Sequence, residues 1–303
     1  MGEWRINPQE NLQDVLDAAP PGTVIRLPAG VMRQKTVIRT PGITLIGAGR
    51  DRTQLVFDHS ARRMDKVGRP LGTFRSFTLA VTAKNVTLRD LTVMNDAGDP
   101  AQKGQQVALS VCGENFVMED GALLSTQDTL FLGPLPPDLR LRYRDLLPEV
   151  LRRPEPLSSR FLNCRIAGSV DFVFGGGSAC FDECELLSVH DGRNLGYVAA
   201  PSHDLTQTEG FVFRRCRFTA APGVAPDSVY LARPWRDHGL AVFEDCTYGL
   251  HICAAGFDRW GTTHRDETAR FYETPQVPGR VGWARQPVPF HIGRKTEKKT
   301  FRR

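Results

Sequence analysis

The sequence lacks long hydrophobic runs. None of its 303 residues falls in an apolar stretch of about 18 or more, the length that a membrane-spanning helix needs. The first residues, MGEWRINPQENLQ, have no basic start followed by an apolar stretch, as a secretory signal would. Ile6 stands where myristoylation of Gly2 would require Ser or Thr. We therefore expect a cytoplasmic protein with no membrane partner.

Paired cysteines and metal-binding motifs are also missing. The seven cysteines are an odd number, and the sequence contains no CxxC pair and no histidines at zinc spacing beside them. We therefore expect free thiols and no cofactor. The net charge of +5 is a small excess, and much of it lies in residues 140–160 and in the tail, residues 294–303. We expect this basic tail to be solvated, with no nucleic-acid partner, and the protein to be a monomer.

The usual motifs of serine and zinc hydrolases are absent as well. The sequence contains no GxSxG segment and no HExxH segment, and its seven histidines are scattered. If the protein is a hydrolytic enzyme, carboxylates must therefore supply its nucleophile and its base.

What the sequence does contain is a repeat. The unit reads apolar, any, apolar, two mostly polar residues, then small or apolar, any, apolar, as in residues 86–93, 211–218 and 241–248. Its copies recur at intervals from 20 residues (161 to 181) to 43 residues (45 to 88). Short period-2 strands at such intervals predict an all-β solenoid rather than a sandwich. The equivalent positions are Leu45, Leu88, Met118, Phe161, Phe181, Phe213 and Phe243.

One helix signal precedes the repeats. Residues 11–19 place four apolar side chains on one face and are followed by Pro20, Pro21 and Gly22, which end a helix. We expect this helix to cap the open end of the first coil, whose strand edges would otherwise be free to pair. The apolar face consists of Leu12, Val15, Leu16 and Ala19.

Four cysteines occupy the same place in their repeat units. Cys164, Cys184, Cys216 and Cys246 each follow the two polar residues of the unit. We interpret them as a stacked row of small apolar side chains in the core. The alternative is that one or more of them bind a metal or act in catalysis.

Two aspartates stand in unusual apolar surroundings. Asp128 lies in the segment QDTLF, and Asp171 lies in GSVDFVFG. An aspartate between apolar residues disfavours a strand, so we expect both side chains on the exposed side of the sheet. A structural alternative is that each one caps a turn or binds a backbone N–H group.

These segments resemble the signature blocks QDTLY and VDFIFG of the pectin methylesterase family. Further blocks agree in order, and the resemblance extends from about residue 10 to residue 285. They are residues 72–76 (GTFRS, resembling TF-S), 105–109 (QQVAL, resembling QAVAL), 231–236 (LARPWR, resembling LGRPW) and 256–260 (GFDRW, resembling GW--W).

The resemblance implies a fold and a set of roles. The fold would be a right-handed, single-stranded parallel β-helix, and the substrate a methyl-esterified oligogalacturonide or pectin. Asp171 would be the nucleophile and Asp128 the acid and base, while Gln105 and Gln127 would stabilise the oxyanion. Arg233 would pair with Asp171 and keep it ionised. Because no export signal is present, we expect short, soluble fragments of pectin as substrates.

Aromatic residues in and beside these blocks are candidate platforms for the sugar rings. Trp235 follows the Arg-Pro turn and is the best-supported candidate, whereas each phenylalanine could instead fill the core. The candidates are Trp235, Phe131, Phe174, Phe74, Phe257 and Trp260.

The chain departs from the family pattern in several places. Phe131 replaces the tyrosine of QDTLY, Phe257 replaces the first tryptophan of GW--W, and residues 175–177 are three glycines where the family has GNA. Asp128 and Asp171 are 43 residues apart (171 − 128), roughly twice the usual family spacing. The excess forms an insert, residues 133–157, inside one domain that spans residues 1–293.

The insert is rich in arginine. Since arginine binds carboxylates through paired hydrogen bonds, we hypothesise that it clamps free carboxylates of the substrate, although a solvated loop with a short helix is the alternative. Its arginines are Arg140, Arg142, Arg144, Arg152 and Arg153.

Other functions remain open at this point. One is an esterase or thioesterase that acts on a different ester with the same carboxylates. Another is a catalytically silent, carbohydrate-binding β-helix, which would be expected to have lost one of the five polar residues. A glycosidase would not need the paired glutamines, and a calcium-dependent lyase would need clustered acidic ligands that are not evident.

Overall fold

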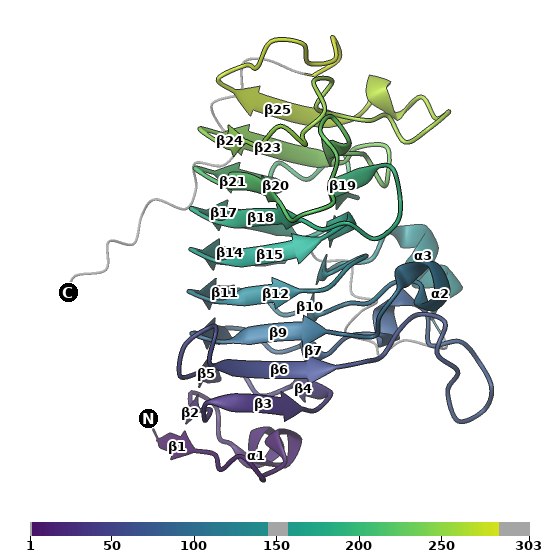
Figure 1. Cartoon of the computed structure of the whole chain (residues 1–303). Coiled ribbons are helices and arrows are strands. Elements are labelled where there is room, and N and C mark those ends of the chain that lie inside the picture. Colours follow the sequence, from purple (N-terminus) through teal and green to yellow (C-terminus); the bar gives the residue numbers. More distant parts are fainter. Residues whose placement is uncertain (1, 145–156, 285–303) are drawn as a thin grey trace.

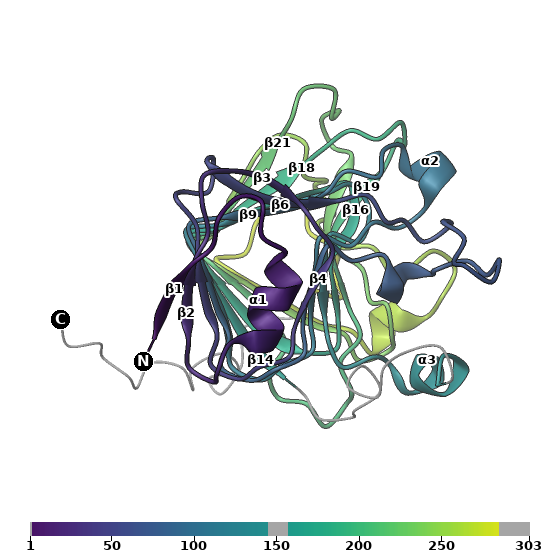
Figure 2. The same cartoon turned by 90° about the horizontal axis from the view of Figure 1, so that it is seen from below.

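The strands of this protein stack in parallel coils. The computed structural model describes residues 2–144 and 157–284. Over these residues the strands form three parallel sheets, A, B and C, which run along the length of the molecule (Figure 1). Viewed along its axis, the solenoid shows the three sheets surrounding one interior (Figure 2). The predicted all-β, right-handed parallel β-helix is confirmed.

Within each sheet, the strands of successive coils pair in parallel. Sheet A comprises, in spatial order, β1 (Glu3–Arg5), β2 (Val24–Arg26), β5 (Thr44–Ile46), β8 (Thr87–Arg89), β11 (Phe116–Glu119), β14 (Ser158–Leu162), β17 (Ser178–Asp182), β20 (Phe211–Arg214), β23 (Leu240–Glu244) and β25 (Arg270–Thr274). Sheet B comprises β3 (Gly30–Arg33), β6 (Thr53–Phe57), β9 (Thr92–Asn95), β12 (Ala122–Leu124), β15 (Arg165–Gly168), β18 (Glu185–Ser188), β21 (Arg217–Ala220) and β24 (Thr247–Tyr248). Sheet C comprises β4 (Thr36–Ile38), β7 (Leu79–Val81), β10 (Leu109–Val111), β13 (Leu130–Leu132), β16 (Val170–Gly175), β19 (Gly196–Pro201) and β22 (Val229–Ala232).

Helices are short and lie outside the coils. None in the described ranges is long and apolar enough to cross a membrane. They are α1 (Leu12–Ala18), α2 (Pro100–Lys103), α3 (Pro137–Arg142) and the 3₁₀ turns η1 (Thr73–Arg75) and η3 (Arg265–Glu267).

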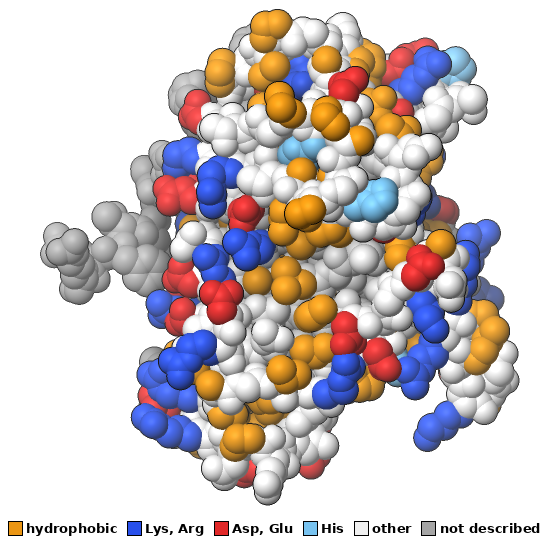
Figure 3. Space-filling view, viewed as in Figure 1, with side chains coloured by type: hydrophobic (Ala, Val, Ile, Leu, Met, Phe, Trp, Pro, Cys, Tyr) orange, Lys and Arg blue, Asp and Glu red, His pale blue; other side chains and the backbone are white. Residues whose placement is uncertain are grey.

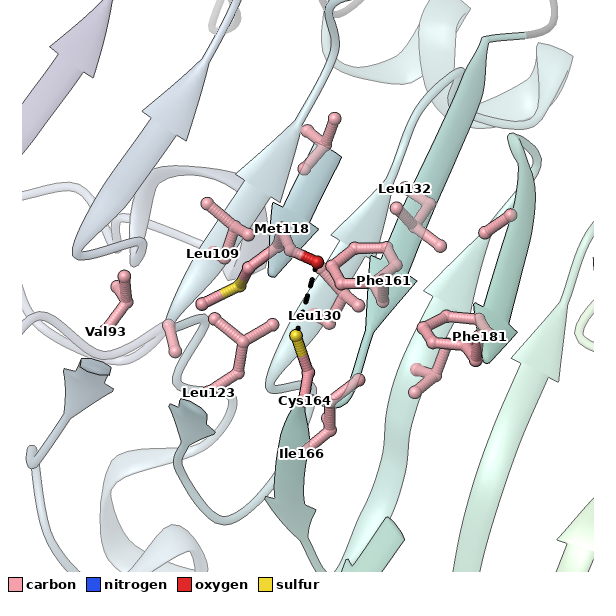
Figure 4. Close-up of a cluster of buried hydrophobic side chains, with 14 of the residues drawn as sticks. Val93, Leu109, Met118, Leu123, Leu130, Leu132, Phe161, Cys164, Ile166 and Phe181 are labelled. Atoms are coloured by element: carbon pink, nitrogen blue, oxygen red, sulfur yellow. Dashed lines mark hydrogen bonds between the residues drawn. The ribbon is translucent and has the colours of Figure 1, made fainter. Parts of the chain in front are cut away.

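The core repeats at the positions that the sequence predicted. Every pair of successive equivalent positions, from Leu45 to Phe243, is paired in the ladder of sheet A. Phe161, Phe181, Phe213 and Phe243 stack nearly parallel, with neighbouring ring centroids 4.7–4.9 Å apart. This spacing equals the distance between strands, so one side chain from each coil fills one layer of the core. Figure 4 shows Phe161 and Phe181 among the aliphatic side chains of sheets B and C.

Replacing Phe181 with alanine is expected to destabilise the fold by about 3–5 kcal/mol, because it empties a buried ring position between two neighbouring rings. Denaturant unfolding followed by circular dichroism measures the change. Leu250→Ala is the matched control, since Leu250 is 88% exposed and its truncation should change stability little. A loss below about 1 kcal/mol for Phe181→Ala would contradict the stacked-core account.

The corner between sheets A and B explains the polar pair in the repeat. The second residue of the polar pair has a left-handed backbone conformation in six coils, with φ between 49° and 55°. These residues are Asp90, Asp120, Asn163, Glu183, Arg215 and Asp245. One such residue reverses the side-chain alternation and turns the chain.

In four coils, a cysteine directly follows the residue with the left-handed conformation. Each thiol donates to a backbone carbonyl of the preceding coil, as Cys164 Sγ does to Met118 O over 3.4 Å. Figure 4 shows this bond within the apolar core. Cys164, Cys184 and Cys216 are fully buried and Cys246 is half-buried, and all seven cysteines are free. The predicted stacked row and the predicted free thiols are confirmed.

Charged side chains pair across neighbouring coils on the outer surface. Arg89 pairs with Glu119 and Arg165 with Glu185, each between residues that face each other in adjacent strands. Figure 3 shows basic and acidic side chains interspersed along the left edge of the molecule. Exposed pairs of this kind each contribute about 0–1 kcal/mol, so the apolar core and not this surface holds the coils together.

Helix α1 closes one end of the solenoid, as predicted. The side chain of Asn11 accepts hydrogen bonds from the backbone N–H groups of Gln13 and Asp14, which caps the helix. Leu12 and Leu16 are buried against the first coils, and Figure 2 shows the helix lying across the open end. The predicted basic tail, residues 294–303, lies outside the described residues.

Candidate active site

A cleft of about 450 Å³ opens on the outer side of sheet C. The five polar residues that the sequence singled out all line it. They come from four coils of the solenoid. Four of them lie before or at the start of a strand of sheet C, and the fifth directly follows the end of such a strand. They are Gln105, Gln127, Asp128, Asp171 and Arg233.

Asp128 and Asp171 lie side by side on adjacent coils. The backbone N–H of Asp128 donates to Val170 O over 3.1 Å, and Gln127 forms a parallel bridge with Val170. Both aspartates have left-handed backbone conformations, with φ of 63° and 50°, and the register of β16 shifts at this point. These backbone irregularities turn both carboxylates outward from the core. Left-handed conformations of residues other than glycine are strained, and such strain is typical of functional sites.

Both aspartates lie on the outer side of the sheet, as expected, but they are nearly buried there. Asp128 is only 9% exposed and Asp171 8%. The walls of the cleft, which stand on other coils and on α3, cover the carboxylates.

Arg233 holds Asp171 in a fixed orientation. Its Nε donates to Oδ1 over 2.8 Å and its Nη2 to Oδ2 over 2.7 Å. The guanidinium carbon lies 3.7 Å from the ring centroid of Tyr197 and 4.1 Å from that of Trp260. Such cation–π contacts use the guanidinium plane and leave its N–H edge for the carboxylate. The sequence analysis missed Tyr197, which lies in a strand without any family motif.

Burial controls the ionisation of both carboxyl groups. It raises the pKa of Asp128 well above its ordinary value, and the charge of Asp171 raises this pKa further. Burial also raises the pKa of Asp171, against which the hydrogen bonds and charge of Arg233 act. The prediction that Arg233 favours the ionised form of Asp171 is therefore correct in direction, but burial was not foreseen. Asp128 is the carboxyl group better suited to hold a proton.

Four of the six predicted aromatic residues line the cleft: Phe74, Phe174, Trp235 and Trp260. Phe131 does not, because it is buried beneath them, with its ring centroid 5.1 Å from Phe74 and 5.2 Å from Phe174. It therefore supports the platform rather than forming it.

The prediction for Phe257 was wrong. Phe257 is buried in the core of the solenoid, with its ring centroid 5.7 Å from Phe243 and 5.3 Å from Phe271. Its neighbour in the motif, Trp260, is the residue that reaches the cleft.

The start of the insert forms one wall of the cleft. Helix α3 contributes Asp138, Leu139 and Arg142, and Tyr143 follows it. Arg236 anchors the helix by donating to both carboxylate oxygens of Asp138, over 3.1 and 2.7 Å. Of the insert's predicted clamp residues, Arg142 lines the cleft, whereas Arg140 and Arg144 are not part of its lining, and Arg152 and Arg153 lie outside the described residues.

The sequence analysis also missed an arginine that contacts one of the cleft residues, Gln127. Arg193 donates from Nη1 to Gln127 Oε1 over 3.0 Å. It lies in the loop between β18 and β19, where nothing in the sequence distinguishes it from other surface arginines. In the part of the chain that the structure describes, no group of three or more His, Cys, Asp or Glu residues could hold a metal ion.

The chain is similar to known proteins over most of its length. A family model described as Pectinesterase matches residues 6–135 and 157–291, and the unmatched residues between them fall within the predicted insert. Pectinesterase 31 of Arabidopsis thaliana is 28% identical over 93% of this chain and 85% of its own length. Pectinesterase/pectinesterase inhibitor U1 of Solanum lycopersicum is 29% identical over 86% of this chain, which spans 42% of that longer protein.

Solved structures agree with these relatives. A crystal structure of a pectin methylesterase in complex with a hexasaccharide is 26% identical, with a TM-score of 0.76 over 92% of this chain and 89% of that one. Pectin methylesterase from carrot is 25% identical, with a TM-score of 0.74 over 93% of this chain and 85% of that one.

Proposed function

Because this chain belongs to the pectinesterase family, we propose that its cleft hydrolyses methyl esters of galacturonate in pectin or its fragments, through Asp171 as nucleophile and Asp128 as acid and base. The observation that carries these roles is a carboxylate held by Arg233 beside a second carboxyl group whose pKa is raised further. Two neighbouring carboxyl groups in different protonation states can divide the work of nucleophile and acid.

In the first half of the reaction, a carboxylate oxygen of Asp171 attacks the ester carbonyl carbon. The carbonyl oxygen becomes an oxyanion, which the side-chain amide N–H groups of Gln105 and Gln127 stabilise. The tetrahedral intermediate then expels the methoxy group, to which Asp128 gives its proton, so that methanol leaves. The product of this half is an anhydride between Asp171 and the galacturonate.

In the second half, Asp128 acts as a base. Now ionised, it removes a proton from a water molecule, whose oxygen attacks the galacturonate carbonyl carbon of the anhydride. Cleavage of the bond to Asp171 releases galacturonic acid, which then loses its remaining proton to the solvent and becomes the free carboxylate. Asp171 returns to its ionised form and Asp128 to its protonated form, while the walls of the cleft keep both groups away from bulk water.

Methanol release tests this function. The purified protein is assayed with a methyl-esterified galacturonate hexamer, polymeric pectin, an O-acetylated hexamer without methyl esters and an aliphatic thioester. We expect one methanol for each carboxylate formed from the methylated substrates and no turnover of the others. Turnover of the acetyl ester or the thioester without methanol release would overturn the proposal. The preference for short fragments remains a prediction. A comparison of kcat/KM for the hexamer and the polymer tests it.

We also propose that Arg142 binds a free carboxylate on a galacturonate next to the reacting one. Arg142 lines the same cleft as Asp128 and Asp171, and among the residues that the structure describes it has no ion-pair partner. Its guanidinium is therefore available for a carboxylate of the substrate.

Replacing Arg142 with alanine is expected to raise KM for a partly de-esterified hexamer about tenfold, which corresponds to roughly 1.4 kcal/mol for one charge-assisted hydrogen bond. KM for the fully methylated hexamer should change little, since that substrate offers no charge. Arg140→Ala is the control, because Arg140 belongs to the same helix but does not line the cleft. An equal rise in KM for both hexamers would refute the carboxylate contact.

A further inference from the structure

Gln127 is held from behind by an arginine that the proposed mechanism does not use. We propose that Arg193 is a positioning residue that fixes the amide of Gln127 so that its N–H group, and not its oxygen, faces the reacting ester. This role rests on the proposed function, in which Gln127 stabilises the oxyanion.

The orientation follows from the chemistry of the two groups. Arg193 Nη1 donates to Gln127 Oε1 over 3.0 Å, and a guanidinium has donors but no acceptor. If the amide were rotated by half a turn, its NH₂ group would face the guanidinium, and two donors would meet. The contact with Arg193 therefore directs the NH₂ group of Gln127 away from the guanidinium.

Gln127 would be poorly restrained without this contact. It lines the catalytic cleft on one side and, on the other, a second hollow of about 280 Å³ that Arg193 and Asp191 also line. With space on both sides, the amide could turn freely. Within the described parts of the chain, the side chain of Gln105 makes no hydrogen bond, so Gln127 is the better preorganised of the two amides.

Arg193 is itself anchored to a buried carboxylate. Asp191, whose side chain is 2% exposed, accepts from Arg193 through both carboxylate oxygens and from the hydroxyl group of Ser169. Ser169 donates through its backbone N–H to Thr126 O over 2.7 Å. Thr126 precedes Gln127, and Ser169 lies two residues before Asp171 in the chain. The anchor therefore ties the oxyanion donor and the nucleophile to one rigid support.

The size of the effect can be bounded. Removing one oxyanion donor costs about 10²- to 10³-fold in kcat in a serine protease. Releasing the amide without removing it should cost less, because the productive orientation is still populated part of the time. We expect Arg193→Met to lower kcat for methanol release about 10- to 30-fold with KM changed less than twofold.

A double-mutant cycle tests whether Arg193 acts through Gln127. Rates are measured for the wild type, Arg193→Met, Gln127→Ala and the double variant, on the methylated hexamer. In the Gln127→Ala background, Arg193→Met should cause no further loss beyond about twofold, since there is no amide left to orient. The full 10- to 30-fold loss in that background, or an Arg193→Met variant as fast as the wild type, would overturn the proposal.

Controls separate positioning from charge and from folding. Arg193 also lowers the pKa of both aspartates, so a purely electrostatic role would shift the pH profile, whereas positioning lowers kcat at every pH. Arg165→Met removes an equally exposed arginine from another ion pair and should leave kcat unchanged. Arg193→Lys, which can still donate to Gln127, should recover part of the rate and serves if Arg193→Met does not fold. A wild type without methanol release would refute the proposed function instead.

Discussion

Replacing Asp171 with asparagine should lower kcat/KM for methanol release by about 10⁴-fold or more, which is the scale of loss when a nucleophile is removed. The amide nitrogen and oxygen of asparagine are poor nucleophiles and cannot form the anhydride. Arg233 can still donate to the asparagine oxygen, so the local structure should persist. Methanol release and thermal unfolding, measured on the same preparation, separate the loss of chemistry from a loss of folding.

Glu185→Gln is the matched control for this change. Glu185 is also a carboxylate that an arginine holds, since Arg165 Nε donates to it over 2.7 Å, but it lies in β18 on sheet B, away from the cleft. Its activity should equal that of the wild type. If Asp171→Asn kept more than about a tenth of the wild-type rate, Asp171 could not be the nucleophile.

Replacing Asp128 with asparagine should lower kcat by about 10²- to 10⁴-fold, the range that a general acid contributes. The amide cannot give a proton to the departing methanol or take one from water. An ester with a more acidic alcohol needs less help from an acid, so a trifluoroethyl ester should lose less activity than the methyl ester. Equal losses on the two esters would contradict the acid role of Asp128.

The raised pKa values predict the shape of the pH profile. Activity requires Asp171 ionised and Asp128 protonated, so it should fall as pH drops through the pKa of Asp171 and as pH rises through that of Asp128. Because burial raises the pKa of Asp171, the acidic limb should lie at a higher pH than the pKa of an ordinary aspartate, which is about 3.9. The alkaline limb should disappear from the residual activity of Asp128→Asn.

The same shift has a consequence for stability. A carboxyl group whose pKa is raised by folding contributes stability at low pH that is lost as pH rises through the folded pKa. For Asp128 the loss begins near its unfolded pKa of about 3.9. Asparagine does not titrate, so the unfolding temperature of Asp128→Asn relative to the wild type should increase with pH. This outcome would show that the carboxylate is kept in the cleft at the expense of stability.

Local patterns in the sequence were sufficient for the scaffold. Period-2 alternation placed Phe161, Phe181 and Phe213 in one layer, because in a solenoid each coil pairs with the next in register. Helix α1 was equally readable, since its capping residue and its apolar face are adjacent in the chain. The five polar residues of the cleft were found through motifs that lie beside the strands of sheet C.

What remained hidden depends on contacts between distant segments. Phe131 and Phe257 occupy motif positions, yet whether an aromatic ring lines a cleft or fills the core depends on which neighbouring coils cover it. The burial that raises the pKa of Asp128 and Asp171 comes from walls on other coils and on α3. Neither effect leaves a local pattern.

The sequence by itself determined the repeating β-helix and the identity of the two aspartates, because both depend on residues close together in the chain. Only the tertiary structure decided how those aspartates are held. Tyr197 and Trp260 both pack against the guanidinium of Arg233, and Arg193 contacts Gln127, from which it is separated by 66 residues in the sequence. Such contacts arise when coils stack at about 4.8 Å, a distance that brings side chains together regardless of their separation in sequence.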